Sequence, residues 1–179
     1  MISPFKKYGL TFRTVEEDDA SFILELRNNK LLSRFLSPTD PDIEKQLKWI
    51  RSYKQREQQN KELYFISLDD KGDRQGLNRL YDYEADCFEI GSWLYKPGLD
   101  TYTAIRGDLA ARDYGFEILS FSYCKFGVRR ANLSVVKYHL GFNPEKTGET
   151  PNDIFFRLSY DNYRKQRNKL LKIIQCEQG

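Results

Sequence analysis

The stretch Phe88-Glu-Ile-Gly-Ser-Trp-Leu-Tyr95 has the composition of a β-strand, and the residues that follow it decide the fold class. Apolar residues at helical spacing predict a long amphipathic helix from Ala104 to Leu119. Tyr123-Cys-Lys-Phe-Gly-Val-Arg129 predicts the next strand, which runs through Asn132 into a second helix ending near Phe142. This order of strand, helix, strand and helix predicts a crossover between two strands of one sheet.

The segments on either side of this stretch alternate between helix and strand. Together they predict an α+β fold with a mixed, mostly antiparallel sheet flanked by helices. Asp69-Asp-Lys-Gly72 is a turn, and residues 31–38 are an irregular connection or a short helix. The expected elements are strands at 10–14, 63–68, 75–83, 87–95 and 154–160, and helices at 16–28, from Pro41 onward, and at 161–174.

Length and composition limit the kind of protein. A chain of 179 residues with 40% hydrophobic residues predicts one folded domain, residues 1–160, with a helical tail at residues 161–179. The tail has one basic and one apolar face, which is typical of a helix packed on its own domain or on a partner subunit. A net charge of +3 is too small to indicate a nucleic-acid partner.

The number and spacing of the cysteines and the lack of long apolar segments are used to predict the cellular compartment. Cys87, Cys124 and Cys176 are widely spaced and odd in number, which favours reduced thiols in a cytoplasmic protein. One histidine and scattered carboxylates form no metal-ligand pattern, so no metal is expected. Residues 1–7 contain no apolar run of the kind found in signal peptides, and no segment approaches the ~20 residues of a membrane span.

Five segments follow one another in a characteristic order. They are Leu10-Thr-Phe-Arg-Thr14 with Glu16 to Asn28, Gln46-Leu-Lys-Trp-Ile50, Glu89-Ile-Gly-Ser-Trp93, Asp113-Tyr-Gly-Phe116 and Val128-Arg-Arg-Ala-Asn132. In this order they resemble the GCN5-related N-acetyltransferase (GNAT) superfamily over about residues 10–160. The resemblance implies a sheet splayed between its fourth and fifth strands around acetyl-CoA, and acetyl transfer from this co-substrate to an amine.

A narrower likeness concerns the acceptor. Gly76-Leu-Asn-Arg-Leu-Tyr-Asp82, Gly91-Ser-Trp93, Tyr138-His139 and Lys146-Thr-Gly-Glu149 resemble a subgroup associated with bacterial surface-polysaccharide biosynthesis. For that subgroup the implied acceptor is an amine on a nucleotide-linked sugar. Arg79, Tyr81 and Asp82 would line the acceptor side, because arginine binds diphosphates bidentately and tyrosine stacks on rings. Plain sheet packing is the alternative for these three residues.

The resemblance also implies a binding site for acetyl-CoA. In the family the fourth strand holds the pantetheine arm, and a glycine-rich loop before a helix holds the diphosphate. The two glycine positions are occupied by Asp100 and Tyr102, and a carboxylate near phosphates is unfavourable unless it turns away. Hydroxyls and one cation would then supply donors. The implied co-substrate residues are Trp93, Leu94, Tyr95, Thr101, Tyr102, Thr103, Ala104, Arg106 and Asn132.

The resemblance assigns proton transfer to the second helix of the crossover region. An alignment without a gap places His139 where the family commonly has a tyrosine that protonates the departing thiolate, and it places Asn143 where glycine is usual. A pKa near 6.5 suits histidine for this role. Tyr138 is the second candidate acid, and Glu89 is the candidate base for the amine. A packed histidine and a solvent-facing glutamate are the alternatives.

These observations predict a cytoplasmic N-acetyltransferase acting on a small amine, without nucleic-acid or membrane partners, and compatible with a homodimer. Two alternatives stay open. One is an enzyme of the same fold that acetylates a protein N-terminus or another amine. The other is a non-catalytic binding module, which the missing loop glycines would explain.

Overall fold

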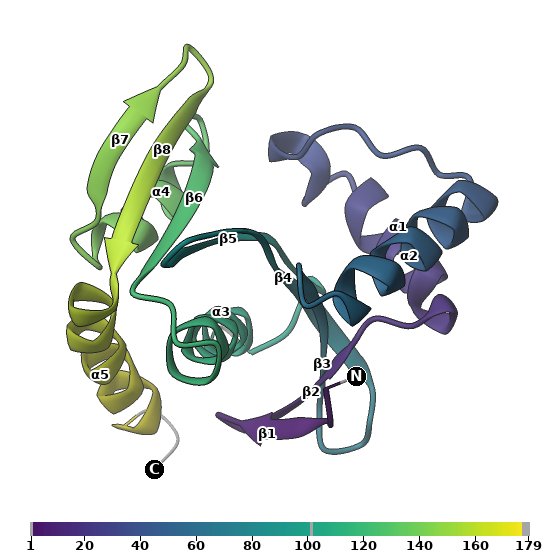
Figure 1. The fold of residues 1–179 in the computed structure, drawn as a ribbon, viewed down its shortest axis with the longest axis horizontal. Helices are drawn as coiled ribbons and strands as arrows, with labels where there is room; N and C mark the ends of the chain where they lie inside the picture. The colour runs from purple at the N-terminus through teal and green to yellow at the C-terminus, as the bar shows by residue number, and fades with distance from the viewer. Residues whose placement is uncertain (1, 101, 177–179) are drawn as a thin grey trace. The chain divides into compact units, whose positions relative to one another are not determined.

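A computed structural model describes residues 2–100 and 102–176, and Figure 1 shows its elements. In chain order they are β1 (Phe5–Lys7), β2 (Leu10–Thr14), η1 (Glu17–Asp19), α1 (Ala20–Asn28), η2 (Ser33–Phe35), α2 (Ile43–Gln58), β3 (Leu63–Leu68), β4 (Arg74–Glu84), β5 (Cys87–Tyr95), α3 (Thr103–Asp113), the π-helical η3 (Tyr114–Ile118), β6 (Tyr123–Arg129), α4 (Leu133–Leu140), β7 (Glu145–Glu149), β8 (Asp153–Ser159) and α5 (Tyr160–Cys176).

The eight strands form one sheet in the order β1-β2-β3-β4-β5-β6-β8-β7. The pairs β1–β2, β2–β3, β3–β4, β6–β8 and β7–β8 are antiparallel. β5 and β6 run parallel, with Cys87 to Glu89 opposite Tyr123 to Lys125. The predicted mixed, mostly antiparallel sheet flanked by helices is therefore confirmed.

The chain divides into two compact units. The first unit comprises residues 1–82 and 91–111, and the second comprises residues 83–90 and 112–179. β4, β5 and α3 each contribute residues to both units, and each unit is described by itself below.

The first unit is built around a cluster of buried apolar side chains. α1 and α2 lie side by side (Figure 1), and both contribute side chains to this cluster. Burying such side chains contributes about 1.5–3 kcal/mol each. The members are Val15, Ala20, Phe22, Ile23, Leu26, Ile50, Tyr53, Tyr64, Ile66, Leu77 and Leu94.

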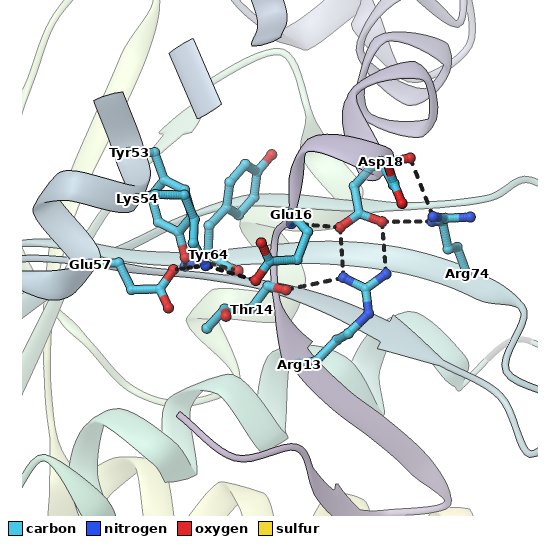
Figure 2. A network of polar contacts seen from close by, with 10 residues as sticks. Arg13, Thr14, Glu16, Asp18, Tyr53, Lys54, Glu57, Tyr64 and Arg74 are labelled. Atoms are coloured by element: carbon cyan, nitrogen blue, oxygen red, sulfur yellow. Dashed lines mark hydrogen bonds and ion pairs between the residues drawn. The ribbon is translucent and has the colours of Figure 1, made fainter. Parts of the chain in front are cut away.

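A buried carboxylate fixes the start of α1 to the strands. Asp19 accepts hydrogen bonds from Arg13 at 2.6 and 2.8 Å and from Arg74 at 2.7 Å, and its side chain is fully enclosed. Figure 2 shows the side chains of Arg13, Arg74 and Glu16 close together in this part of the first unit. Burial alone would raise the pKa of Asp19, but the hydrogen bonds from Arg13, the Glu16 backbone and Arg74 outweigh it and lower the pKa.

The core of the second unit centres on Tyr163 of α5. Its ring stacks on Phe116 at 5.0 Å and on Phe142 at 5.9 Å, and its hydroxyl donates to Asp113 Oδ1 at 2.8 Å. Arg167, one turn further on, also donates to Asp113 at 2.6 Å. The apolar face of the predicted basic tail is thus packed on its own unit.

Four elements differ from the sequence expectations. β1 and β7, at the two edges of the sheet, were not expected. α2 begins at Ile43 rather than at Pro41, because the Asp42 side chain accepts from the Glu44 and Lys45 amides and caps the helix there. The long helix expected to reach Leu119 changes to a π-helical turn at Tyr114, where Gly115 lies against the Phe88 ring.

Two further findings concern single residues. Asn143, which the gap-free alignment places where glycine is usual, has a φ of +52°, in the left-handed region that favours glycine. Cys87 and Cys124 are buried free thiols.

None of the helices in the described part of the chain is both long and apolar enough to cross a membrane.

Candidate active site

β5 has a local distortion at its centre. Ser92 adopts a φ of +50°, which is uncommon for a residue with a side chain and rare within a strand. Phe88 to Gly91 alternate between buried and half-buried, and this alternation stops at Ser92, since Gly91, Ser92 and Trp93 are all half-buried. A kink of this kind re-aims side chains and backbone amides of the strand.

The three residues predicted to hold the pantetheine arm occupy different environments. Trp93 Nε1 donates to the Ala104 carbonyl at 2.8 Å, which ties β5 to the first turn of α3. Leu94 belongs to the core of the first unit. The Tyr95 hydroxyl donates to Asn78 Oδ1 at 2.8 Å, and burial raises its pKa, so the phenol stays protonated.

Gly107 is required by the position of Tyr95. A Cβ atom at residue 107 would lie 1.6 Å from the Tyr95 hydroxyl oxygen. The absence of a side chain therefore lets α3 approach β5 closely in the first unit. The loop between these elements, where the diphosphate is expected, is held in place by this contact and by the Trp93–Ala104 bond.

The carboxylate in the predicted diphosphate loop has a cationic partner. Arg106 Nη2, from the first turn of α3, lies 2.8 Å from Asp100 Oδ2, so the negative charge that opposes phosphate binding has a positive partner. The Thr103 amide donates to the Asp100 carbonyl at 3.0 Å, and the Arg106 amide donates to the Tyr102 carbonyl at 2.8 Å. Thr101 lies outside the described residues.

The first unit contains a pocket of about 330 Å³. Its lining brings together residues of α1, the α1–α2 connection, α2, β3, β4 and β5. Three of the lining side chains are cationic and one is a carboxylate. The lining residues are Ile23, Arg27, Pro38, Thr39, Asp40, Lys45, Gln46, Trp49, Tyr64, Arg79 and Ser92.

Arg79, which was predicted to bind the acceptor substrate, lines this pocket, but its guanidinium already pairs with a carboxylate of the protein. Its Nη2 donates to Glu62 Oε2 at 2.6 Å, and the other Glu62 oxygen pairs with Arg56 at 3.2 Å. The guanidinium of Arg79 also lies 5.1 Å from the Trp49 ring and 4.5 Å from the Tyr81 ring. Of the other two predicted acceptor residues, Tyr81 therefore contacts Arg79, and Asp82 is exposed with a φ of +50°.

His139 is enclosed in the second unit. The residue is 5% exposed, its ring lies 4.5 Å from that of Phe126, and Arg112 Nη2 lies 3.4 Å from its Nδ1. Because arginine offers only donors, Nδ1 is the acceptor and the ring proton is on Nε2. Burial, with the charge of Arg112 beside it, holds the pKa of His139 well below 6.5. The imidazole is therefore neutral at neutral pH.

The other predicted residues of the second unit are more accessible. Tyr138 is half-buried, with its ring 5.0 Å from that of His139. Asn132 precedes α4, where its Oδ1 accepts from the Ser134 hydroxyl at 3.2 Å. Glu89 is half-buried on β5, in register with Lys125 of β6. The structure thus brings Tyr138 and His139 together, whereas Glu89 is on a different element.

Sequence reasoning missed several residues of the pocket. Arg27, Trp49, Tyr64 and Ser92 were seen only as parts of helices and strands. Glu62, which binds Arg79 behind the pocket, was not considered. The positive charge of Arg27 in an otherwise apolar helix face was the available signal. The other contacts join residues far apart in the sequence.

Comparison with known proteins agrees with this fold. The model of the "Acetyltransferase (GNAT) domain" family matches residues 9–140. The structure described as "Apo FdhC, a nucleotide-linked sugar GNAT" is 32% identical, with a TM-score of 0.84 over 96% of this chain and 98% of that one. No curated protein sequence matches the chain.

More distant structures share the fold alone. The ribosomal-protein-S5-alanine acetyltransferase from Vibrio fischeri is 14% identical, with a TM-score of 0.75 over 90% of this chain and 99% of that one. The spermidine N-acetyltransferase from Vibrio cholerae, in complex with CoA and spermine, is 21% identical, with a TM-score of 0.71 over 87% and 98%. The family match and the similarity to FdhC together show that the chain belongs to the GNAT acetyltransferase family.

Proposed function

We propose that this protein transfers an acetyl group from acetyl-CoA to an amine of a nucleotide-linked amino sugar. The observation that carries the proposal is the charge of the pocket in the first unit, where Arg27, Lys45 and Arg79 outnumber the single carboxylate Asp40. Such a lining attracts an anionic acceptor and repels a polyamine. The similarity to FdhC, whose description names a nucleotide-linked sugar, supports the same class of acceptor.

The residues of the first unit fit acetyl-CoA as the co-substrate. Arg106 balances Asp100, so the loop carries no net negative charge toward a diphosphate. The N-terminus of α3, which starts at Thr103, supplies backbone amides and the positive end of a helix dipole. We infer that this loop holds the diphosphate and that β5 holds the pantetheine arm.

The chemistry would be direct attack of the neutral amine on the thioester carbonyl. A backbone N–H at Trp93 or Leu94 would stabilise the charge that develops on the carbonyl oxygen. Glu89 would accept the proton of the amine. His139 and Tyr138 are the candidates that protonate the departing thiolate. Because His139 is enclosed and neutral, Tyr138 competes directly with it for this role.

Release of free CoA thiol across three acceptor classes tests the proposal. The acceptors are nucleotide-linked amino sugars, spermine and a peptide with a free N-terminus. We expect saturable release with a nucleotide-linked amino sugar and little with spermine. A preference for spermine or for the peptide would overturn the assigned acceptor. Calorimetry with acetyl-CoA tests the remaining alternative, since a non-catalytic module without this site would give no saturable heat.

A further inference from the structure

The three cationic side chains that line the pocket differ in whether an acidic side chain of the protein already pairs with them. Lys45 pairs with Asp40, and both side chains are largely exposed. Arg79 shares the buried carboxylate of Glu62 with Arg56. Both of these pocket cations therefore have an acidic partner within the protein.

Arg27, in the last turn of α1, has no acidic partner among the described residues. Its hydrogen bond runs from Nε to the Thr39 hydroxyl, a neutral group, at 2.6 Å. The two Nη groups have no acceptor within the described part of the chain. A half-buried guanidinium of this kind retains the paired donors that match the geometry of a phosphate or carboxylate.

The surroundings of Tyr64 show where Arg27 lies relative to other polar groups of the pocket. Burial raises the pKa of Tyr64, while the positive charges of Arg27 and Arg79 oppose that rise. Tyr64 and Ser92 line the pocket together with both arginines, so their hydroxyls belong to the same lining as the two guanidinium groups.

We propose that Arg27 is the residue that selects an anionic acceptor, by binding its phosphate group beside Tyr64 and Ser92. This inference rests on the proposed function, whose acceptor carries a diphosphate. It divides the roles of the two arginines. Arg79 is held by Glu62 and shapes the pocket, whereas Arg27 makes the contact that depends on the charge of the acceptor.

Calorimetric titration without acetyl-CoA tests this division. The probes are UDP, inorganic pyrophosphate and the uncharged nucleoside uridine, so that recognition of the anion is separated from recognition of the base. The variants are Arg27→Gln, which removes the charge, and Arg27→Lys, which keeps it without the bidentate geometry. Arg51→Gln is the matched control, since it loses the same charge from an exposed pair with Glu17 outside the pocket.

We expect Arg27→Gln to weaken binding of UDP and pyrophosphate about ten- to hundredfold, the usual effect of losing a charge-assisted contact. Arg27→Lys should fall between wild type and Arg27→Gln, and Arg51→Gln should stay within about twofold of wild type. Uridine binding should not respond to residue 27. Circular dichroism melting establishes that each variant is folded, and Arg27→Lys serves as the test if Arg27→Gln is not.

Three results would overturn the inference. They are equal anion binding by the Arg27 and Arg51 variants, no binding of either anion by the wild type, and an equal loss of uridine and UDP on changing Arg27. Failure of the proposed function is a separate result, because it is measured in the assay of CoA thiol release, as a preference for spermine or the peptide or as no release at all. UDP binding that depends on Arg27 would stand even then.

Discussion

The indole Nε1 of Trp93 donates a hydrogen bond to the Ala104 carbonyl at 2.8 Å and so joins the kinked part of β5 to the first turn of α3. This bond spans the loop in which we place the diphosphate of acetyl-CoA. Trp93→Phe keeps an aromatic ring but removes the donor. We expect acetyl-CoA to bind several-fold more weakly, in line with the loss of about 1 kcal/mol. Calorimetry provides the measurement, and an unchanged dissociation constant would place the diphosphate elsewhere.

The second prediction distinguishes the effect of an arginine that lines the pocket from the effect of breaking an ion pair with Glu62. Arg79→Ala should raise the acceptor KM more than the acetyl-CoA KM. Arg56→Ala is the matched control, because Arg56 binds the same Glu62 and contacts the same Trp49 ring but does not line the pocket. Both variants should lose about 1–3 kcal/mol of stability, since Glu62 loses a partner. If Arg56→Ala shifts the acceptor KM as strongly, the effect of Arg79 comes from packing.

The third prediction concerns proton transfer. If His139 protonates the thiolate, His139→Ala should lower kcat by about 10²-fold with little change in acetyl-CoA affinity. Tyr138→Phe tests the competing candidate, because it removes the hydroxyl and keeps the ring. Steady-state kinetics on both variants identifies the acid. A folded His139→Ala variant with near-wild-type kcat would remove His139 from the mechanism.

The fourth prediction follows from the lowered pKa of His139. Below about pH 6.5 the unfolded chain protonates this histidine, whereas the folded chain keeps it neutral. Its contribution to stability is therefore present above that pH and is lost as the pH falls, by up to about 1.4 kcal/mol per pH unit. Denaturant unfolding between pH 5 and 8 should show a weaker pH dependence in His139→Gln than in the wild type. Parallel profiles for the two proteins would mean that the imidazole titrates normally in the fold.

The fifth prediction tests the contact between Tyr95 and α3. Gly107→Ala should destabilise the protein by about 1–3 kcal/mol, because the new methyl group would overlap the Tyr95 hydroxyl. Gly148→Ala is the control, since a Cβ there would meet Phe155 at an ordinary 3.9 Å. Thermal unfolding of the two variants should differ clearly. Equal melting temperatures would show that Tyr95 moves aside at little cost.

The pattern of residue types within each segment was enough to predict several strands inside the sheet, because their own side chains favour the β conformation. β2, β3 and β6 begin and end where alternation and β-branched or aromatic residues predict. β1 and β7 escaped prediction because they are short, charged edge strands that depend on pairing with a neighbour. Their sequences, Phe5-Lys-Lys7 and Glu145-Lys-Thr-Gly-Glu149, carry no apolar alternation.

The pocket was only partly predictable for a related reason. Arg79 was recognised from the β4 segment, but its partner Glu62 lies 17 residues earlier and becomes a neighbour through strand pairing. Arg27 and Thr39 belong to a helix and to an irregular connection whose course no local rule predicts. The residue type alone was enough to identify Arg79 as a cation on β4. Only the tertiary contacts distinguish Arg79, which has an acidic partner, from Arg27, which has none among the described residues.

The left-handed backbone at Ser92 has a consequence for protein engineering. Glycine adopts this conformation without the strain that a side chain brings, so Ser92→Gly is a substitution that a thermostability screen would favour. The same change would remove a hydroxyl from the lining of the pocket. At position 92, therefore, thermal stability favours glycine, whereas recognition of the acceptor favours serine. A stabilised version of this protein should be sought at other positions.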